Sequence, residues 1–205
     1  MSDYDWVDIE AIALTFLRGA RPEDVVHVLR LDPSSERLRT FDEAEADPDV
    51  SSDAFPVQLE ELEGWLVVVE PNGFLMTDHD VLLRLSRGGE AVCYFRNVNA
   101  VSDFLVARDG RLVRAFDPVL FDDEEGEPLP EEQGLDFADD DADDQALSFT
   151  LLERLTGIPI EESWLLERPR RTWLAPHPPP SGPEQPADYV SRRPGPSEWG
   201  MGRLR

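Results

Sequence analysis

The N-terminal part of the chain places apolar side chains at helical spacing. Over residues 5–19 they recur every three or four positions, which predicts an amphipathic helix that ends at Gly19. Pro22 opens a second predicted helix, because a proline in the first helical turn forfeits no hydrogen bond. Thr40 and Glu43 form a capping-box pattern, which predicts a short third helix directly after Thr40.

The middle of the chain changes to the patterns of β-strands. Residues 55–59 alternate apolar and polar side chains, as in a strand with one buried face. Residues 65–69 form a continuous apolar run, which is typical of a central strand covered on both faces. The segment Pro71-Asn72-Gly73 predicts a turn, and a return strand is expected to begin at 74–76.

The best-specified strand pair is a predicted β-hairpin. Apolar runs at 104–107 and 112–116 flank Asp109-Gly110, and an Asp-Gly pair between such runs is a strong hairpin signal. A further strand is predicted at 91–95. We therefore expect a mainly antiparallel sheet of five or six strands.

Three more helices are predicted around and after these strands. The first is capped by Thr77 and ends at Gly88. The second begins near residue 144, carries leucines at four-residue spacing and ends at Gly157. A short last helix is expected over 159–167.

These elements indicate an α+β fold, with a central, mostly antiparallel sheet packed by N- and C-terminal helices. We expect one domain over residues 1–168. Within it, residues 117–144 are predicted to be a flexible acidic loop, because like charges repel and little apolar surface is available for burial. Residues 169–205 contain 9 of the 18 prolines and are predicted to form a disordered Pro/Arg-rich tail.

The composition excludes several kinds of enzyme. All 19 basic residues are arginines, so the chain has no P-loop lysine, no Schiff-base lysine and no lysine general base. Cys93 is the single cysteine and lies within a predicted strand, which rules out an internal disulfide and predicts a small buried side chain. The acidic N-terminus lacks the basic region of a signal peptide, and no apolar run is long enough to span a bilayer. We expect a cytoplasmic protein without a membrane partner.

The usual motifs of catalytic and metal sites are missing. The sequence contains no HExxH, GxSxG or GxGxxG motif. The histidines His27, His79 and His177 lie far apart in the sequence, and the aspartates at 139–144 lack the ligand spacing of an EF-hand loop. We therefore predict neither a metal site nor a cofactor.

One set of polar residues lies where predicted strands end. Strand ends that point the same way meet at one edge of a sheet, where carboxylates can act in binding or in acid–base chemistry. In the alternative interpretation, the same acids only cap turns and the arginine pairs with a surface acid. The candidate binding residues are Glu70, Asn72, Arg96, Asn97, Asn99 and Asp117.

The charge balance indicates which partners the protein can attract. The chain carries 44 acidic and 19 basic residues, a net charge of −25. A body of this charge repels phosphate, so we do not expect a nucleic-acid-binding face. It attracts a basic protein, whose association it would accelerate, or it serves solubility alone.

Several segments resemble one known family. They are WLVVVEPNGF at 65–74, GEAVCYFRNVNA at 89–100 and the run from Asp109 to Pro118. In order and spacing they are similar to an uncharacterised actinobacterial domain family of unknown function, over roughly residues 4–168. The resemblance implies no activity, but it suggests that Glu70, Asn72 and Gly73 belong to a family hallmark.

The favoured hypothesis is a non-enzymatic interaction module, of the immunity or regulatory type, that binds a basic protein through an acidic surface. The alternative is a small-molecule-binding or hydrolytic domain that uses the carboxylates at the rim of the sheet. The sequence leaves the oligomeric state open.

Overall fold

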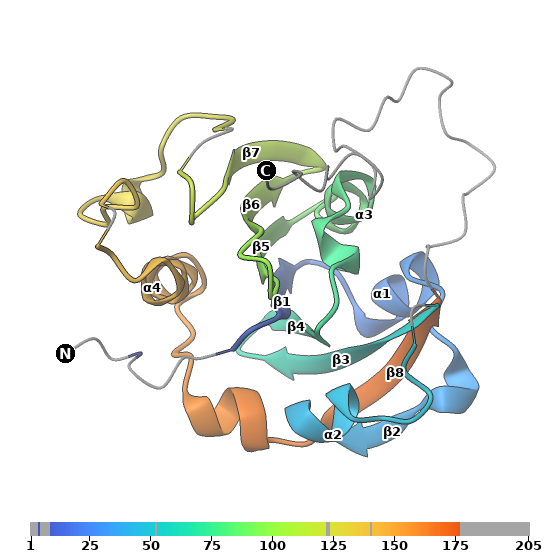
Figure 1. The fold of residues 1–205 in the computed structure, drawn as a ribbon. Helices are drawn as coiled ribbons and strands as arrows, with labels where there is room; N and C mark the ends of the chain where they lie inside the picture. The colour runs from blue at the N-terminus through green and yellow to red at the C-terminus, as the bar shows by residue number, and fades with distance from the viewer. Residues whose placement is uncertain (1–3, 5–8, 52, 122–123, 140, 177–205) are drawn as a thin grey trace, which may run out of the picture.

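The computed structural model describes residues 4, 9–51, 53–121, 124–139 and 141–176 (Figure 1). Its centre is a single sheet of eight strands in the order β2-β8-β3-β4-β1-β5-β6-β7, in which every neighbouring pair is antiparallel. The strands are β1 (Ile12–Arg18), β2 (Arg37–Arg39), β3 (Ala54–Leu62), β4 (Trp65–Pro71), β5 (Glu90–Arg96), β6 (Ser102–Arg108), β7 (Arg111–Phe116) and β8 (Arg170–Pro176).

Helices cover both faces of this sheet. The α-helices are α1 (Pro22–Val28), α2 (Phe41–Glu45), α3 (His79–Leu85) and α4 (Asp144–Thr156). Shorter helical turns are η1 (Pro33–Ser35), η2 (Leu75–Thr77), η3 (Pro130–Glu132) and η4 (Ser163–Glu167). In Figure 1, α4 lies on one side of the sheet and α1 and α3 lie on the other.

Each face of the sheet has its own hydrophobic core. Side chains alternate along a strand, so Leu14 and Phe16 of β1 point to one face and Leu17 points to the other. The first face, which we call the α4 face, packs against Phe149 of α4. The second, the α1/α3 face, packs against Leu82 of α3 and its neighbours. Because both faces are buried, the central strands read as unbroken apolar runs.

The fold class, the central strand at 65–69 and the Asp109-Gly110 hairpin are confirmed. Asp109 and Gly110 both have positive φ angles, +49° and +75°, as the tight turn between right-twisted strands requires. The capping box at α2 is also present: Thr40 Oγ1 accepts a hydrogen bond from the Glu43 N–H at 3.3 Å, and the Glu43 carboxylate accepts one from the Thr40 N–H at 3.0 Å.

The helix predicted over 5–19 is wrong where the structure describes it. Residues 12–18 form β1, which lies between β4 and β5 and is buried from Ile12 through Leu17. A run of consecutive apolar residues satisfies helical spacing as well as strand spacing, so periodicity alone does not separate the two. Residues 5–8 of the predicted helix lie outside the described residues.

The sheet has eight strands where five or six were expected, and the folded domain extends beyond residue 168. Residues 170–176, assigned to the tail, form β8 between β2 and β3. The strand was not predicted, because the two arginines at its start, Arg170 and Arg171, suggested a basic tail. The rest of the predicted tail, 177–205, lies outside the described residues.

Two local predictions near the turn after β4 also need correction. The return strand expected at 74–76 is the 3₁₀ turn η2. The N-cap of α3 is Asp78 and not Thr77, since Asp78 Oδ1 accepts the N–H groups of Asp80 at 2.8 Å and Val81 at 3.2 Å.

Candidate functional site

The predicted site residues lie at one end of the sheet. β4 and β5 both run antiparallel to β1, so their last residues, together with the start of β6 and the end of β7, share that end. We call this end the sheet rim. Ile12 of β1 lies between Pro71 of β4 and Arg96 of β5 in the register.

Glu70 lies at the rim but faces away from solvent. Its side chain is 0% exposed on the α1/α3 face, below the turn that follows β4. Its carboxylate accepts the Met76 N–H at 3.2 Å, and no ion pair to it is present among the described residues. Burial therefore raises the pKa of Glu70 to about 8.

Gly73 closes the turn directly over this carboxyl side chain. A Cβ atom at Gly73 would lie only 2.7 Å from the Glu70 Cβ. The Gly73 N–H also donates to the Glu70 carbonyl oxygen at 3.2 Å. The pair that the resemblance marks as a hallmark thus packs together in a turn that encloses an acid.

Arg96 points to the opposite face of the sheet. It forms an ion pair with Asp144, the first residue of α4. The Tyr94 hydroxyl is buried nearby, and burial raises its pKa. Burial also raises the pKa of Asp144. The Arg96–Asp144 pair attaches the start of α4 to the end of β5.

Asn72, Asn97, Asn99 and Asp117 lie in turns. Asn72 is exposed and has a φ of +54°, and its N–H donates to the Ala11 carbonyl at 3.2 Å. Asn97 Oδ1 accepts the Asn99 N–H at 2.9 Å, so it closes the turn between β5 and β6.

Asp117 closes the next turn and reaches its neighbour. Its Oδ1 accepts the Ser102 hydroxyl at 2.6 Å and the Val119 N–H at 2.8 Å. The structure thus brings Arg96, Asn97, Asn99 and Asp117 to adjoining turns, while Glu70 lies on the other face. Glu70 is buried below its own turn and Asp117 is hydrogen-bonded to Ser102 and Val119, so the two carboxylates are engaged separately.

The described residues of the acidic segment after β7 make contacts with the rest of the domain. Arg114 of β7 is buried and forms two hydrogen bonds of 2.9 Å with the Glu132 carboxylate. It also pairs with Glu124 at 2.7 Å. Residues 122–123 and 140 of the segment lie outside the described residues.

Residues of α4 and of the hydrophobic core also contact this segment. Arg154 of α4 donates to the carbonyl oxygens of Glu131 at 2.8 Å and Gln133 at 2.9 Å. Phe137 is buried on the α4 face, with its ring centroid 5.0 Å from that of Phe116. The sequence did not indicate these contacts, since Arg114 reads as an ordinary polar residue on an edge strand.

We call residues 124–139 and 141–143 the acidic ridge. Most of its acidic residues are exposed, whereas Leu129, Glu132 and Phe137 are buried. The sequence contains no basic residue from 115 to 153. The exposed acids of the ridge are Glu124, Glu125, Glu127, Asp136, Asp139, Asp141 and Asp143.

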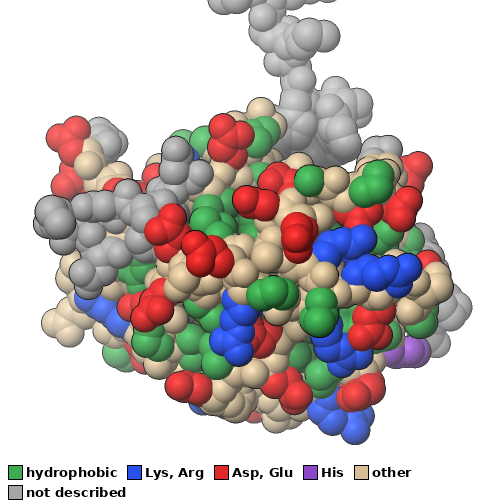
Figure 2. All heavy atoms as spheres, turned by 90° about the horizontal axis from the view of Figure 1, so that it is seen from below, with side chains coloured by type: hydrophobic (Ala, Val, Ile, Leu, Met, Phe, Trp, Pro, Cys, Tyr) green, Lys and Arg blue, Asp and Glu red, His purple; other side chains and the backbone are tan. Residues whose placement is uncertain are grey.

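The opposite edge of the sheet looks different. Figure 2 views the molecule from below, where arginine and acidic side chains are interspersed. Several of them pair, as Arg171 does with Glu36 at 2.8 Å and Arg168 does with Glu60 at 2.8 Å. Charge is therefore balanced locally there, whereas the ridge has one sign only.

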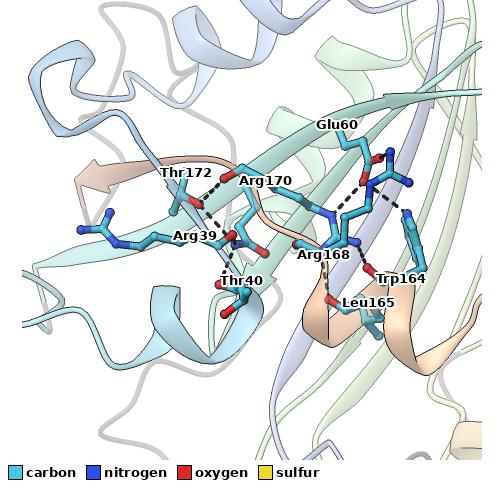
Figure 3. Close-up of polar contacts among 9 residues, drawn as sticks. Arg39, Thr40, Glu60, Trp164, Leu165, Arg168, Arg170 and Thr172 are labelled. Carbon is cyan, nitrogen blue, oxygen red and sulfur yellow. Dashed lines mark hydrogen bonds and ion pairs between the residues drawn. The ribbon is translucent and has the colours of Figure 1, made fainter.

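A buried polar layer joins β8 to β3 and to η4 (Figure 3). Arg170 donates to Glu60 at 3.0 Å and to the Leu165 carbonyl at 2.9 Å. Trp164 Nε1 donates to the same Glu60 carboxylate at 3.2 Å. This layer is enclosed and its donors are satisfied, so we assign it to the attachment of β8 and not to ligand binding.

Two open hollows flank α1. One, of about 410 Å³, lies beside β8 and includes His27, Arg30 and Trp173. The other, of about 310 Å³, lies toward α3 and includes Arg84 and Arg87. Neither contains a predicted site residue.

Within the described ranges, no group of His, Cys, Asp and Glu side chains is placed to hold a metal ion. In the same ranges, no helix has the length and apolar character needed to cross a membrane.

Comparison with known proteins gives one match. No curated protein and no solved structure matches the chain. A family of unknown function, DUF6461, matches residues 1–177, a range that includes β8. The chain therefore belongs to the DUF6461 family of unknown function.

Proposed function

We propose that this chain is a non-enzymatic protein-interaction module, of the immunity or regulatory type, that binds a basic protein through the acidic ridge. The observation that carries the proposal is a set of exposed carboxylates, free of basic neighbours in sequence, on a segment that Arg114 and Arg154 hold in place. A held surface loses less conformational entropy on binding than a free loop would.

The distribution of charge favours this surface over the rest of the molecule. Elsewhere arginines already neutralise many acids, as Arg108 does for Glu90 at 2.6 Å and Arg171 does for Glu36. The ridge itself contains no basic residue, and Arg114 of β7, which is buried, pairs with Glu132 and Glu124. The remaining carboxylates are available to steer and bind a partner with many Arg or Lys residues.

The hydrolytic alternative has less support. Glu70 is enclosed below its own turn, and Asp117 accepts hydrogen bonds from its own turn and from Ser102. A cytoplasmic location and an actinobacterial source, which fits the arginine-only basic residues, remain parts of this proposal.

Affinity capture with two charge-matched variants tests the proposal. The ridge variant neutralises five exposed acids and keeps their shape: Glu125→Gln, Glu127→Gln, Asp136→Asn, Asp139→Asn and Asp141→Asn. The control variant removes the same charge from α2, the loop after it and the β3–β4 hairpin: Glu45→Gln, Asp49→Asn, Asp53→Asn, Glu61→Gln and Glu63→Gln.

Wild-type protein immobilised in lysate at low salt, about 0.05 M, should retain basic proteins that elute by about 0.5 M, where the Debye length falls to a few ångströms. The control variant should retain the same proteins and the ridge variant should lose them. Retention of neutral or acidic proteins, or equal retention by the two variants, would contradict the proposal.

A further inference from the structure

Two turns at the sheet rim carry apolar side chains that the fold leaves in solvent. The turn between β5 and β6 leaves Val98 65% exposed, and the turn after β7 leaves Leu120 68% exposed. Val101, Val119 and Phe121 on the same turns are half-buried. We call these five residues the rim patch.

Hydrogen bonds fix the two turns to each other. The Ser102 hydroxyl donates to Asp117 at 2.6 Å and accepts the Val119 N–H at 3.3 Å. Asn97 closes the first turn, since its Oδ1 accepts the Val101 N–H at 3.1 Å. The rim patch is therefore one surface made by two joined turns.

Both turns hold a residue in a disfavoured backbone conformation. Ala100 has a φ of +56° and Phe121 a φ of +44°, the left-handed region that residues with a Cβ atom seldom adopt. The Phe121 ring packs against Phe116, with centroids 5.8 Å apart, and stacks on Phe137 at 6.0 Å. Core contacts thus hold the second turn in a shape that leaves Leu120 outside, a form of strain that tends to occur at functional sites.

Acidic residues neighbour this patch. The second turn continues into the acidic ridge, and Asp117 lies in the turn itself. Asp143 and Asp144 begin α4 on the α4 face, where Asp144 pairs with Arg96. An exposed apolar patch with acidic neighbours complements a basic segment that also carries apolar side chains.

We propose that the rim patch is the apolar anchor of the partner-binding surface, and that the partner binds it through a basic segment with aliphatic or aromatic side chains among its Arg and Lys residues. The inference rests on the proposed function, because it adds the partner's chemistry to the same surface. Acidic residues speed the encounter, while burial of Val98 and Leu120 slows dissociation.

Two peptide probes of equal charge separate these contributions. One is an amphipathic peptide of lysine and leucine, and the other has serine in place of each leucine. Fluorescence anisotropy at about 0.15 M salt gives the ratio of their dissociation constants. We expect wild-type protein to bind the leucine peptide at least about tenfold more tightly.

Substitutions then test which residues are responsible for the tighter binding of the leucine peptide. Val98→Ser with Leu120→Ser should bring the ratio close to one, whereas Leu38→Ser, which changes a side chain 71% exposed on β2, should leave it unchanged. Val98, Leu120 and Leu38 are all exposed, so the melting temperature of each variant should equal that of wild-type protein. If the double variant melts lower, Leu120→Gln alone provides the comparison.

The outcomes separate the inference from the proposed function. A ratio near one for wild-type protein, or a ratio that the rim double variant leaves unchanged, would overturn the inference even if the ridge variant weakens both peptides. If the ridge variant binds each peptide as tightly as wild-type protein does, the result would instead contradict the proposal that the acidic ridge binds a basic partner. If Leu38→Ser also brings the ratio of dissociation constants close to one, the preference for leucine would not depend on the rim patch, and this too would overturn the inference.

Discussion

Replacement of Glu70 by glutamine should change how the stability of the protein depends on pH. Glu70 is fully buried, and within the described part of the chain its carboxylate is hydrogen-bonded by backbone N–H groups alone. Burial raises its pKa from 4.5 to about 8. Glutamine keeps the shape and can still accept the Met76 N–H, but it has no charge to bury.

The sign and size of the effect follow from linkage. Between pH 4.5 and about 8 the folded protein holds a proton that the unfolded chain releases, so a rise in pH destabilises the wild-type fold. Each pH unit is worth about 1.4 kcal/mol, which over this interval gives a loss of about 5 kcal/mol as an upper bound. A loss of that order is a large fraction of the 5–15 kcal/mol that is typical for a domain.

Urea unfolding measured at each pH unit from 5 to 9 checks this. At pH 5 the wild-type protein and Glu70→Gln should have similar free energies of unfolding. At pH 9 the variant should be more stable by several kcal/mol. Glu61→Gln, which removes an exposed acid from β3, is the control and should run parallel to wild type. Parallel curves for Glu70→Gln would refute the assignment of Glu70 as a buried, uncompensated acid.

Three further predictions concern the ridge anchor, the hallmark turn and the domain end. Arg114→Met leaves the Glu132 carboxylate buried without its partner and should cost about 3–5 kcal/mol in urea unfolding, whereas Arg154→Gln should cost about 1 kcal/mol. Gly73→Ala places a Cβ against Glu70 and should lower stability by about 1–3 kcal/mol, measured in the same way; a neutral result would contradict the close packing. A chain ended at Pro176 should keep a cooperative thermal transition and one ended at Arg168 should lose it, because β8 lies between β2 and β3; equal melting curves would contradict this role.

The sequence predicted correctly those elements that a few neighbouring residues are enough to specify. Asp109-Gly110 requires positive φ angles that few other pairs adopt easily, and the Thr40–Glu43 box satisfies its own helix end. Both therefore appear in the structure as predicted. β1 and β8 differ, because an unbroken apolar run and a strand that starts with two arginines become strands only through their neighbours in the sheet.

The candidate site shows the same division. That Glu70, Arg96 and Asp117 occur at one end of the sheet followed from where strands end, but which face each side chain points to depends on register. The contacts of the acidic ridge were not predicted, because they come from other parts of the chain: Arg114 on β7, Arg154 on α4 and the Phe116 ring. Charge density, on which the prediction of a flexible loop rested, carries no information on such contacts.

The most direct test of the central claim is the association rate of the captured basic partner as a function of salt. Stopped-flow measurements from about 0.02 to 0.5 M salt would compare wild-type protein with the ridge and control variants. If the acidic ridge is the binding surface, association should slow steeply with salt for wild-type protein and the control variant, and should be slow and nearly independent of salt for the ridge variant. Equal salt dependence in the ridge and control variants, which carry the same net charge, would show that the ridge is not where the partner binds.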